Sequence, residues 1–391
     1  MRRQPRVVYG VVFLDALLMF AIVPLLPGYV HDLHLSKTQA GLVVGIYSGA
    51  VLVFSVPVGY LAARVGARPL TIFGVALLAA ATFGCAFADG FWPLLVARAG
   101  QGLSSAISWT AAMAWLSEAS EPGTRGRVLG TAMSFATVGG LLGPVAGGVL
   151  GGAYSLRTPF LLLGSVTVVL TVLVWRAPAG VKAPPPVGVG MLVRAVGRSH
   201  TMLAALVMMV LVATVSGTIE TLVPLRLGID GYSAIAITVF LTASGLLASA
   251  SNYGVGRIYD RFGGIPIAMV SILGMAVFVA ALAAAPTGLV LGIIFVAATP
   301  AITGQYAVAF PLCADGADAA GLAHANVFGL LNLAWGAGFL VGPAAGAALS
   351  QATSDRVTYL ALVAVSLLVA LALRPLALSY KECQPSRLNV G

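Results

Sequence analysis

Two acidic residues lie inside strongly apolar stretches, where a charged side chain is costly. Asp15 is part of FLDALLMFAIVPLLPGY, and Glu220 is part of IETLVP. An ionisable group at the depth of a bilayer costs about 2.5 to 3.5 kcal/mol on insertion scales, so it normally faces a protein cavity on a substrate or proton path. A carboxylate in such a place can bind and release a proton, or pair with a cationic substrate. We therefore predict that Asp15 and Glu220 are the proton and substrate carboxylates, facing one cavity.

Each of these acids also has a plainer interpretation. Asp15 could be a structural group whose oxygens are satisfied by neighbouring hydroxyls. Glu220 lies in the outer part of its apolar run, so it could instead belong to the outer interface of the membrane. Only the surroundings of the two side chains distinguish these alternatives.

An arginine and a glutamine form a second constellation inside an apolar run. Arg98 and Gln101 are three residues apart in LLVARAGQGLSS. A fixed positive charge near an acid changes the proton affinity of that acid, which can tie protonation to conformation. We predict a coupling role for both residues. The alternative is that Arg98 lies shallow enough for its long side chain to reach the membrane surface.

The composition is that of a polytopic membrane protein. Charged residues make up 8% and hydrophobic residues 59% of the chain, against about 25% and 45–50% in soluble domains, and the mean hydropathy is +1.01. About 20 apolar residues cross a bilayer as a helix. Twelve such runs occur, near residues 7–28, 40–62, 70–88, 92–116, 128–150, 158–176, 201–225, 234–255, 265–285, 288–311, 325–349 and 357–374. The sequence thus predicts an all-α fold of twelve transmembrane helices.

The basic residues indicate topology. Most of the 21 lysines and arginines fall on the side of the N-terminus when the spans are laid out in order. The positive-inside rule then places both termini in the cytoplasm. Arginine far outnumbers lysine, and Ala, Gly and Val are abundant, which is the usage of a GC-rich bacterial genome. We therefore expect the membrane to be a bacterial cytoplasmic (inner) membrane. The net charge of +9 is accounted for in this way, without a nucleic-acid partner.

Three short strings recur at nearly one spacing, which indicates an internal repeat. Residues 23–28, 59–66 and 142–147 match residues 223–228, 256–263 and 341–346, at offsets of 200, 197 and 199. We predict two six-helix bundles related by pseudo-two-fold symmetry: an N-terminal bundle at 1–176, a polar cytoplasmic linker at 177–199, and a C-terminal bundle with a short cytoplasmic tail at 200–391. Parallel repeats of this kind hold substrate at their interface and work by alternating access.

Several of these strings resemble signatures of the major facilitator superfamily. The loop string is Gly59, Arg64, Gly66 and Arg68, with Ala63 in place of the acid of the family, and its second copy is Gly256, Asp260, Arg261 and Gly263. Gly143, Pro144 and Gly147 are similar to the antiporter motif of exporting members, and Gly342 and Pro343 repeat it. The alternative for these glycines is small-residue helix packing alone.

The whole chain resembles the drug:proton antiporter branch, which includes bacterial multidrug efflux and vesicular monoamine transporters. The Arg98 and Gln101 string carries this resemblance together with Asp15 and Glu220. It implies a twelve-helix fold whose substrate cavity includes Met19, Ser105, Gln305, Tyr306, Asn332, Trp335 and Phe339. Asn332, Trp335 and Phe339 also share one helical face by their spacing, although such a stripe could simply be packing or lipid contact.

We therefore expect a proton-coupled antiporter that exports hydrophobic, cationic small molecules of drug or amine type. The alternative is a facilitator or importer of a neutral metabolite, and a receptor is a third possibility that the repeat and the deep acids disfavour. No nucleotide-binding loop, zinc spacing or nucleophile arrangement occurs, so we expect no enzyme, no metal and no cofactor, with the proton gradient as the driving force. The expected partners are a small-molecule substrate, protons and the lipid bilayer, and the expected state is a monomer.

Overall fold

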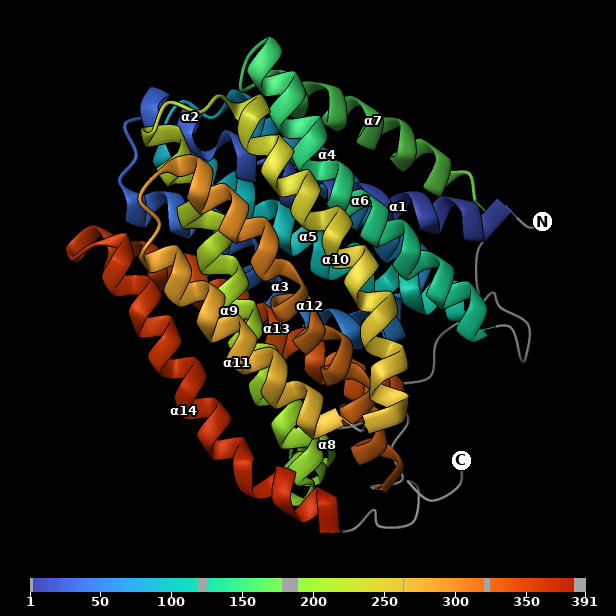
Figure 1. Ribbon diagram of the computed structural model, residues 1–391. Coiled ribbons are helices and arrows are strands. Elements are labelled where there is room, and N and C mark those ends of the chain that lie inside the picture. Colours follow the sequence, from blue (N-terminus) through green and yellow to red (C-terminus); the bar gives the residue numbers. More distant parts are fainter. Residues whose placement is uncertain (1–2, 119–124, 178–188, 263, 320–323, 383–391) are drawn as a thin grey trace.

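The computed structural model describes residues 3–118, 125–177, 189–262, 264–319 and 324–382, and within these ranges the secondary structure is helical, without strands. Figure 1 shows the resulting bundle. The first half contains helices α1 (Arg3–Ala21), η1 (Val23–Leu25), α2 (Leu26–Asp32), α3 (Lys37–Val65), α4 (Ala67–Phe87), α5 (Phe91–Glu118), α6 (Arg125–Ala153) and α7 (Thr158–Trp175). After α8 (Val189–Arg198) follow α9 (His200–Ile229), α10 (Ala234–Phe262), α11 (Gly264–Ala283), α12 (Gly288–Ala319), α13 (His324–Ala352) and α14 (Asp355–Glu382).

Eleven segments of the described residues are long and apolar enough to cross a membrane. The helix at the predicted fourth span, α5, is not one of them, because Arg98, Gln101 and several serines interrupt its apolar sequence. It nevertheless packs along α3 and α4 inside the bundle. Eleven of the twelve predicted spans are therefore apolar enough by composition, and the fourth is a long helix that lies inside the bundle but is less apolar.

The first predicted span is not one continuous helix. α1 ends at Ala21, a 3₁₀ turn covers Val23–Leu25, and α2 begins at Leu26. Pro24 and Pro27 lie in the first turns of η1 and α2, where a residue without a backbone N–H is tolerated. The equivalent helix α9 contains one proline, Pro224, and continues to Ile229.

Glycines at every fourth residue bring pairs of helices into close contact. On α6, Gly139, Gly143 and Gly147 lie against the backbone of α1 at Phe13, Leu17 and Ala21; on α13, Gly338, Gly342 and Gly346 lie against Val210, Thr214 and Thr218 of α9. A side chain at these positions would collide with the facing helix. Small residues therefore set the distance between these helices.

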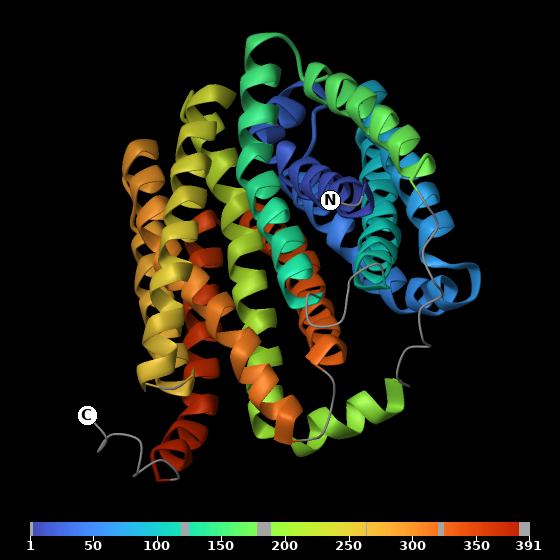
Figure 2. The same cartoon turned by 90° about the vertical axis from the view of Figure 1, so that its right-hand side faces the viewer.

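The two halves of the chain meet along two further helix pairs. α3 packs on α13, and α6 packs on α10. Figure 2 shows α9–α14 largely on one side and α1–α7 on the other, with α8 along one end of the molecule. The predicted linker is thus helical in its last part.

Candidate functional site

Asp15 is buried between α1, α3 and α5, with 4% of its surface exposed. The Tyr47 hydroxyl donates to Asp15 Oδ1 at 3.2 Å, and the Ser105 hydroxyl donates to Oδ2 at 2.8 Å. No basic residue of the described ranges forms an ion pair with it. Its two oxygens are therefore satisfied by neutral hydroxyls, as the structural interpretation of the sequence allowed.

Arg98 is only 1% exposed, which excludes the alternative of an arginine reaching the membrane surface. Its guanidinium donates to Val43 O at 3.2 Å, Gln101 Oε1 at 2.8 Å and Met19 O at 3.3 Å. Gln101 in turn donates to Thr82 Oγ1 at 3.0 Å. The two predicted coupling residues thus form one buried network that reaches α1, α3, α4 and α5.

Tyr47 connects this network to Asp15. The Arg98 Cζ atom lies 5.0 Å from the centroid of the Tyr47 ring, while the hydroxyl of the same ring donates to Asp15. A cation over an aromatic ring is attracted by the electrons of the ring face. Arg98 is therefore linked to Asp15 through Tyr47 and not by direct contact.

A cavity of about 660 Å³ opens beside Asp15. It extends from Asp15 and Met19 to Gly59 and Tyr60 near the end of α3 and to Gly329 near the start of α13. Asp15 is the one charged residue of its lining, which includes Tyr47, Ser105, Trp109, Met209, Tyr306, Phe310, Asn332 and Trp335. The space suits an apolar molecule that carries one or a few polar groups.

Glu220 lines a second cavity of about 470 Å³, between α6, α9, α10 and α12. The prediction that both acids face one cavity is therefore wrong in this structure. The two cavities are adjacent, because Met133, Tyr306 and Trp335 line both. Glu220 Oε2 is buried and has no hydrogen-bond partner within the described residues.

Five of the seven predicted cavity residues line the Asp15 cavity: Met19, Ser105, Tyr306, Asn332 and Trp335. Gln305 and Phe339 line neither cavity. Gln305 is fully buried and donates to Met275 Sδ at 3.1 Å, because consecutive residues of a helix point in different directions and Tyr306 faces the cavities. Phe339 is buried behind Trp335, with ring centroids 5.1 Å apart.

The residues of the loop signature have separate structural roles. Gly66 adopts φ +100° between α3 and α4, a conformation that glycine accepts readily. Gly59 lines the Asp15 cavity, Arg64 is exposed, and Arg68 Nη2 donates to Trp175 O at the end of α7. The predictions for Gly256, Asp260, Arg261 and Gly263 lie outside the residues whose side chains are described.

The antiporter-like strings are packing elements. Gly143 and Gly147 contact α1, while Gly342 contacts α9. The carbonyl of Pro144 accepts a hydrogen bond from Thr238 of α10 at 3.2 Å, and Pro343 lies against Gly41 of α3. These strings therefore also join the two halves of the chain.

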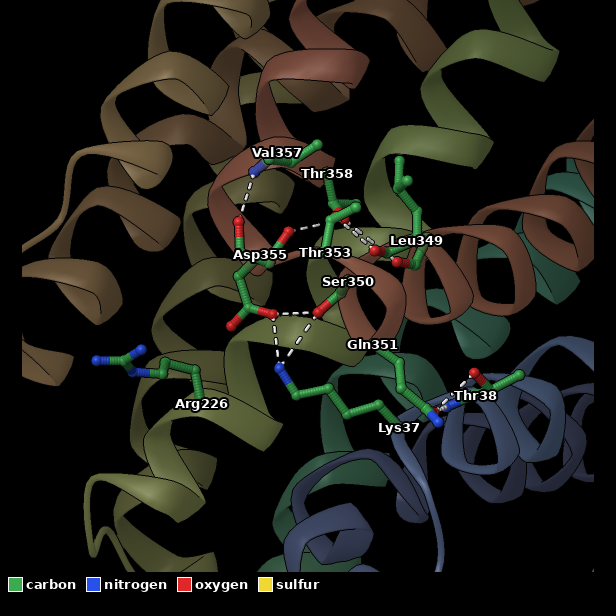
Figure 3. Close-up of polar contacts among 12 residues, drawn as sticks. Lys37, Thr38, Arg226, Leu349, Ser350, Gln351, Thr353, Asp355, Val357 and Thr358 are labelled. Atoms are coloured by element: carbon green, nitrogen blue, oxygen red, sulfur yellow. Dashed lines mark hydrogen bonds and ion pairs between the residues drawn. The ribbon is translucent and has the colours of Figure 1, made fainter.

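A polar cluster ties the halves together at one end of the bundle (Figure 3). Lys37 Nζ at the start of α3 lies 2.8 Å from Asp355 Oδ1 at the start of α14, and it also donates to Ser350 Oγ at 3.2 Å. The Thr38 backbone N–H and hydroxyl both donate to Gln351 Oε1, at 2.9 and 2.8 Å. Ser350 donates to Asp355. This end is therefore closed, opposite the end where the Asp15 cavity reaches Gly59 and Gly329.

Sequence reasoning missed Tyr47. The available signal was its place in GIYSGA, where it is a single aromatic among small residues of a predicted span. That signal does not identify the face of the helix. Gly102 of α5 determines the contact, because it lets α5 lie directly against the backbone of Tyr47.

Comparison with known proteins identifies the family. The model of the Major Facilitator Superfamily matches residues 8–325, and the chain belongs to this superfamily. The protein is therefore a transporter-family membrane protein with the fold that this superfamily shares.

Individual relatives are similar over parts of the chain. An MFS-type transporter, ppzB, of Metarhizium rileyi is 32% identical over 182 residues, covering 44% of this chain and 38% of the relative. A probable vesicular acetylcholine transporter-B of Danio rerio is 31% identical over 169 residues, covering 41% and 34%. A probable sugar efflux transporter of Mannheimia succiniciproducens is 24% identical over 328 residues, covering 83% and 82%. The chain thus matches little more than a third of the length of the first two relatives.

Among solved structures, a bacterial homologue of the human lysosomal transporter Spinster, crystallised in an inward-facing and unoccupied conformation, has a TM-score of 0.80. The sequences are 17% identical, and the match covers 95% of each chain. At this identity the similarity establishes the fold.

Proposed function

We propose that this protein is a proton-coupled antiporter that exports hydrophobic, cationic small molecules by alternating access. The observation that carries the proposal is the position of Asp15, a carboxylate without a basic partner among the described residues, beside a largely apolar cavity. An uncompensated carboxylate can be neutralised by a proton or by a cationic substrate. Competition between the two is the elementary step of antiport.

The direction of transport rests on the expected topology. With both termini in the cytoplasm, the Asp15 cavity reaches the cytoplasmic side near Gly59, and the Lys37–Asp355 cluster closes the outer side. This is a state that receives substrate from the cytoplasm. Protons arriving from outside would then displace substrate outward, and each unit of pH difference supplies about 1.4 kcal/mol per proton.

A neutral-metabolite facilitator is the other candidate, and one relative carries the name of a sugar efflux transporter. A site for a sugar needs many hydrogen-bonding groups around the ligand. Apart from Asp15 and Asn332, the polar side chains of the first cavity are hydroxyls and the indoles of two tryptophans. This lining favours a cation with an apolar body.

The proposal is tested with purified protein in liposomes under an imposed pH gradient, by following uptake of a fluorescent organic cation. We expect gradient-dependent accumulation in the wild type and its loss in Asp15→Asn and Glu220→Gln. Gln305→Leu is the matched control, because Gln305 lines neither cavity. If both acid variants transport like the wild type, or if uptake ignores the gradient, proton-coupled cation antiport is wrong.

A further inference from the structure

Glu220 differs from Asp15 in the state of its oxygens. Both Asp15 oxygens accept hydrogen bonds, whereas Glu220 Oε2 is buried without a donor among the described residues. A buried carboxylate oxygen that lacks a donor is costly and normally has an explanation. The missing donor has to come either from the surrounding side chains or from outside the protein.

The hydroxyl groups of the Glu220 cavity do not supply that donor, because their hydrogens are used elsewhere, and the indole N–H of Trp335 is used in a hydrogen bond to Tyr306. Four serines and threonines of the lining donate to backbone carbonyls of their own helices: Thr137 to Met133, Ser216 to Val212, Ser249 to Gly245, and Thr303 to Thr299. The hydroxyls of Ser244 and Thr299 lie 2.8 Å apart, and because Thr299 donates to Phe295 O at 3.4 Å, Ser244 donates to Thr299 Oγ1. With the Ser216 hydrogen used in this way, the Tyr306 hydroxyl donates to Ser216 Oγ across 2.9 Å. Each of these hydroxyls carries one hydrogen only.

The rest of the lining defines the complementary ligand. Glu220 is the one charged residue of this cavity, and its wall is mostly apolar, with the aromatic rings of Phe295, Phe20 and Trp335. A negative charge in an apolar and aromatic pocket is complementary to an ammonium group on an aromatic or aliphatic body. To satisfy Glu220 Oε2 as well, such a ligand must donate a hydrogen bond from its own N–H.

We propose that the Glu220 cavity is a subsite for a protonated amine that retains at least one N–H, which donates to Glu220 Oε2. The apolar body of the amine packs on Trp335 and Phe295. This inference rests on the proposed function and narrows its substrate class from cations in general to N–H-bearing ammonium ions. It also assigns ligand binding to Glu220 in a cavity separate from that of Asp15.

The consequence is a preference between two ligands of equal charge. A tertiary ammonium ion donates one N–H, whereas its N-methylated quaternary counterpart has the same charge and nearly the same size but no donor. Charge-assisted hydrogen bonds are among the stronger ones in proteins. We expect the tertiary ion to bind about tenfold more tightly, which corresponds to about 1.4 kcal/mol.

The experiment is equilibrium binding by calorimetry to the purified full-length protein in nanodiscs, without a pH gradient. The probes are N,N-dimethyl-2-naphthylmethylamine, protonated at neutral pH, and the N,N,N-trimethyl derivative of the same skeleton. The proteins are the wild type, Glu220→Gln and Asp15→Asn. Thermal unfolding of each variant verifies that it is folded.

The expected result is a tenfold preference for the tertiary ion in the wild type and in Asp15→Asn, and none in Glu220→Gln. Equal binding of the two probes to the wild type overturns the inference, and so does the absence of binding by either, since a proton alone then suffices for Glu220. A preference that disappears in Asp15→Asn but survives in Glu220→Gln overturns it too. The wild-type comparison decides even if a variant does not fold.

This measurement is independent of the transport test. A Glu220-dependent preference without gradient-driven uptake would support the subsite and contradict proton-coupled antiport. Gradient-driven uptake without the preference would support antiport and contradict the subsite.

Discussion

Tyr47 lies between two buried charged residues of the first half, Asp15 and Arg98. Its ring lies under the Arg98 guanidinium and its hydroxyl donates to Asp15. The Tyr47 side chain thus contacts both the positively charged Arg98 and the Asp15 carboxylate beside the first cavity. If Asp15 changes its charge during transport, Tyr47 is the residue through which the Arg98 network responds.

We predict that Tyr47→Phe lowers gradient-driven cation uptake about tenfold. The substitution keeps the ring beside Arg98 and removes only the hydroxyl that donates to Asp15, and a hydrogen bond to a charged group contributes about 1.5 to 3 kcal/mol. The measurement is initial uptake rate in liposomes at a fixed gradient. Tyr359→Phe is the control, since the buried Tyr359 hydroxyl has no partner among the described residues; equal rates in both variants would contradict a role for the Tyr47 hydroxyl.

Arg98→Lys should destabilise the protein although the positive charge is kept. The guanidinium serves three acceptors on α1, α3 and α5, and a lysine ammonium does not reproduce that planar fork. We expect a loss of about 2 kcal/mol or more in unfolding free energy, because buried acceptors lose donors. Thermal unfolding in detergent measures it. Arg226→Lys, in an exposed ion pair with Asp230, should shift the midpoint by less than a degree or two.

At the scale of elements, glycine strings determine how closely helices approach. The strings of α6 and α13 put one glycine per turn against α1 and α9. The helices that carry Asp15 and Glu220 are therefore held against α6 and α13 by nearly direct backbone contact. The glycines that resemble the antiporter motif are the same glycines that pack α6 on α1 and α13 on α9. The two interpretations that the sequence left open for them are therefore compatible.

Gly147→Ala tests this contact. A Cβ atom at Gly147 would overlap the backbone of Ala21, and overpacking of this kind costs about 1 to 3 kcal/mol. We expect a clearly lower unfolding temperature. Gly130→Ala on the same helix is the matched control, because nothing lies within 4 Å of its added Cβ and alanine is the better helix former. A Gly147→Ala protein as stable as Gly130→Ala would show that the α1–α6 contact adapts freely.

At the scale of the whole molecule, the two halves are joined at one end and separated by cavities toward the other. The joined end has the Lys37–Asp355 ion pair and the hydrogen bonds of Thr38 to Gln351. Below it, Val44 and Ala213 belong to an apolar cluster formed by both halves, together with Leu225 and Phe339. The proposed alternating access would require this end to open.

Reversal of one charge at the joined end should favour its opening. Lys37→Asp places two carboxylates together, so we expect a cysteine introduced by Val44→Cys, in a background without the native cysteines, to react several-fold faster with a membrane-impermeant maleimide. Lys37→Asp combined with Asp355→Lys should return the rate toward the original value. Because the pair is partly exposed, its own contribution is about 1 kcal/mol or less. An unchanged labelling rate in the single variant would mean that the apolar cluster alone holds the end closed.

The sequence by itself determined the class of fold, the internal repeat and the residues that carry charge into the membrane. Runs of apolar residues, the offset near 200 and the rarity of buried charge are all visible along one chain. It also singled out Asp15 as an acid in an apolar run, and Asn332 and Trp335 by their helical spacing, and all three line the first cavity.

The tertiary structure alone decided which side chains meet. Only the packing of α5 on α3 placed Tyr47 between Arg98 and Asp15, and only the arrangement of α6, α9, α10 and α12 gave Glu220 a cavity of its own. Gln305 and Phe339 share the sequence character of cavity residues, yet the neighbouring helices cover them. The physical reason is that periodicity specifies a direction around one helix axis, whereas a cavity depends on the rotation and separation of several helices at once.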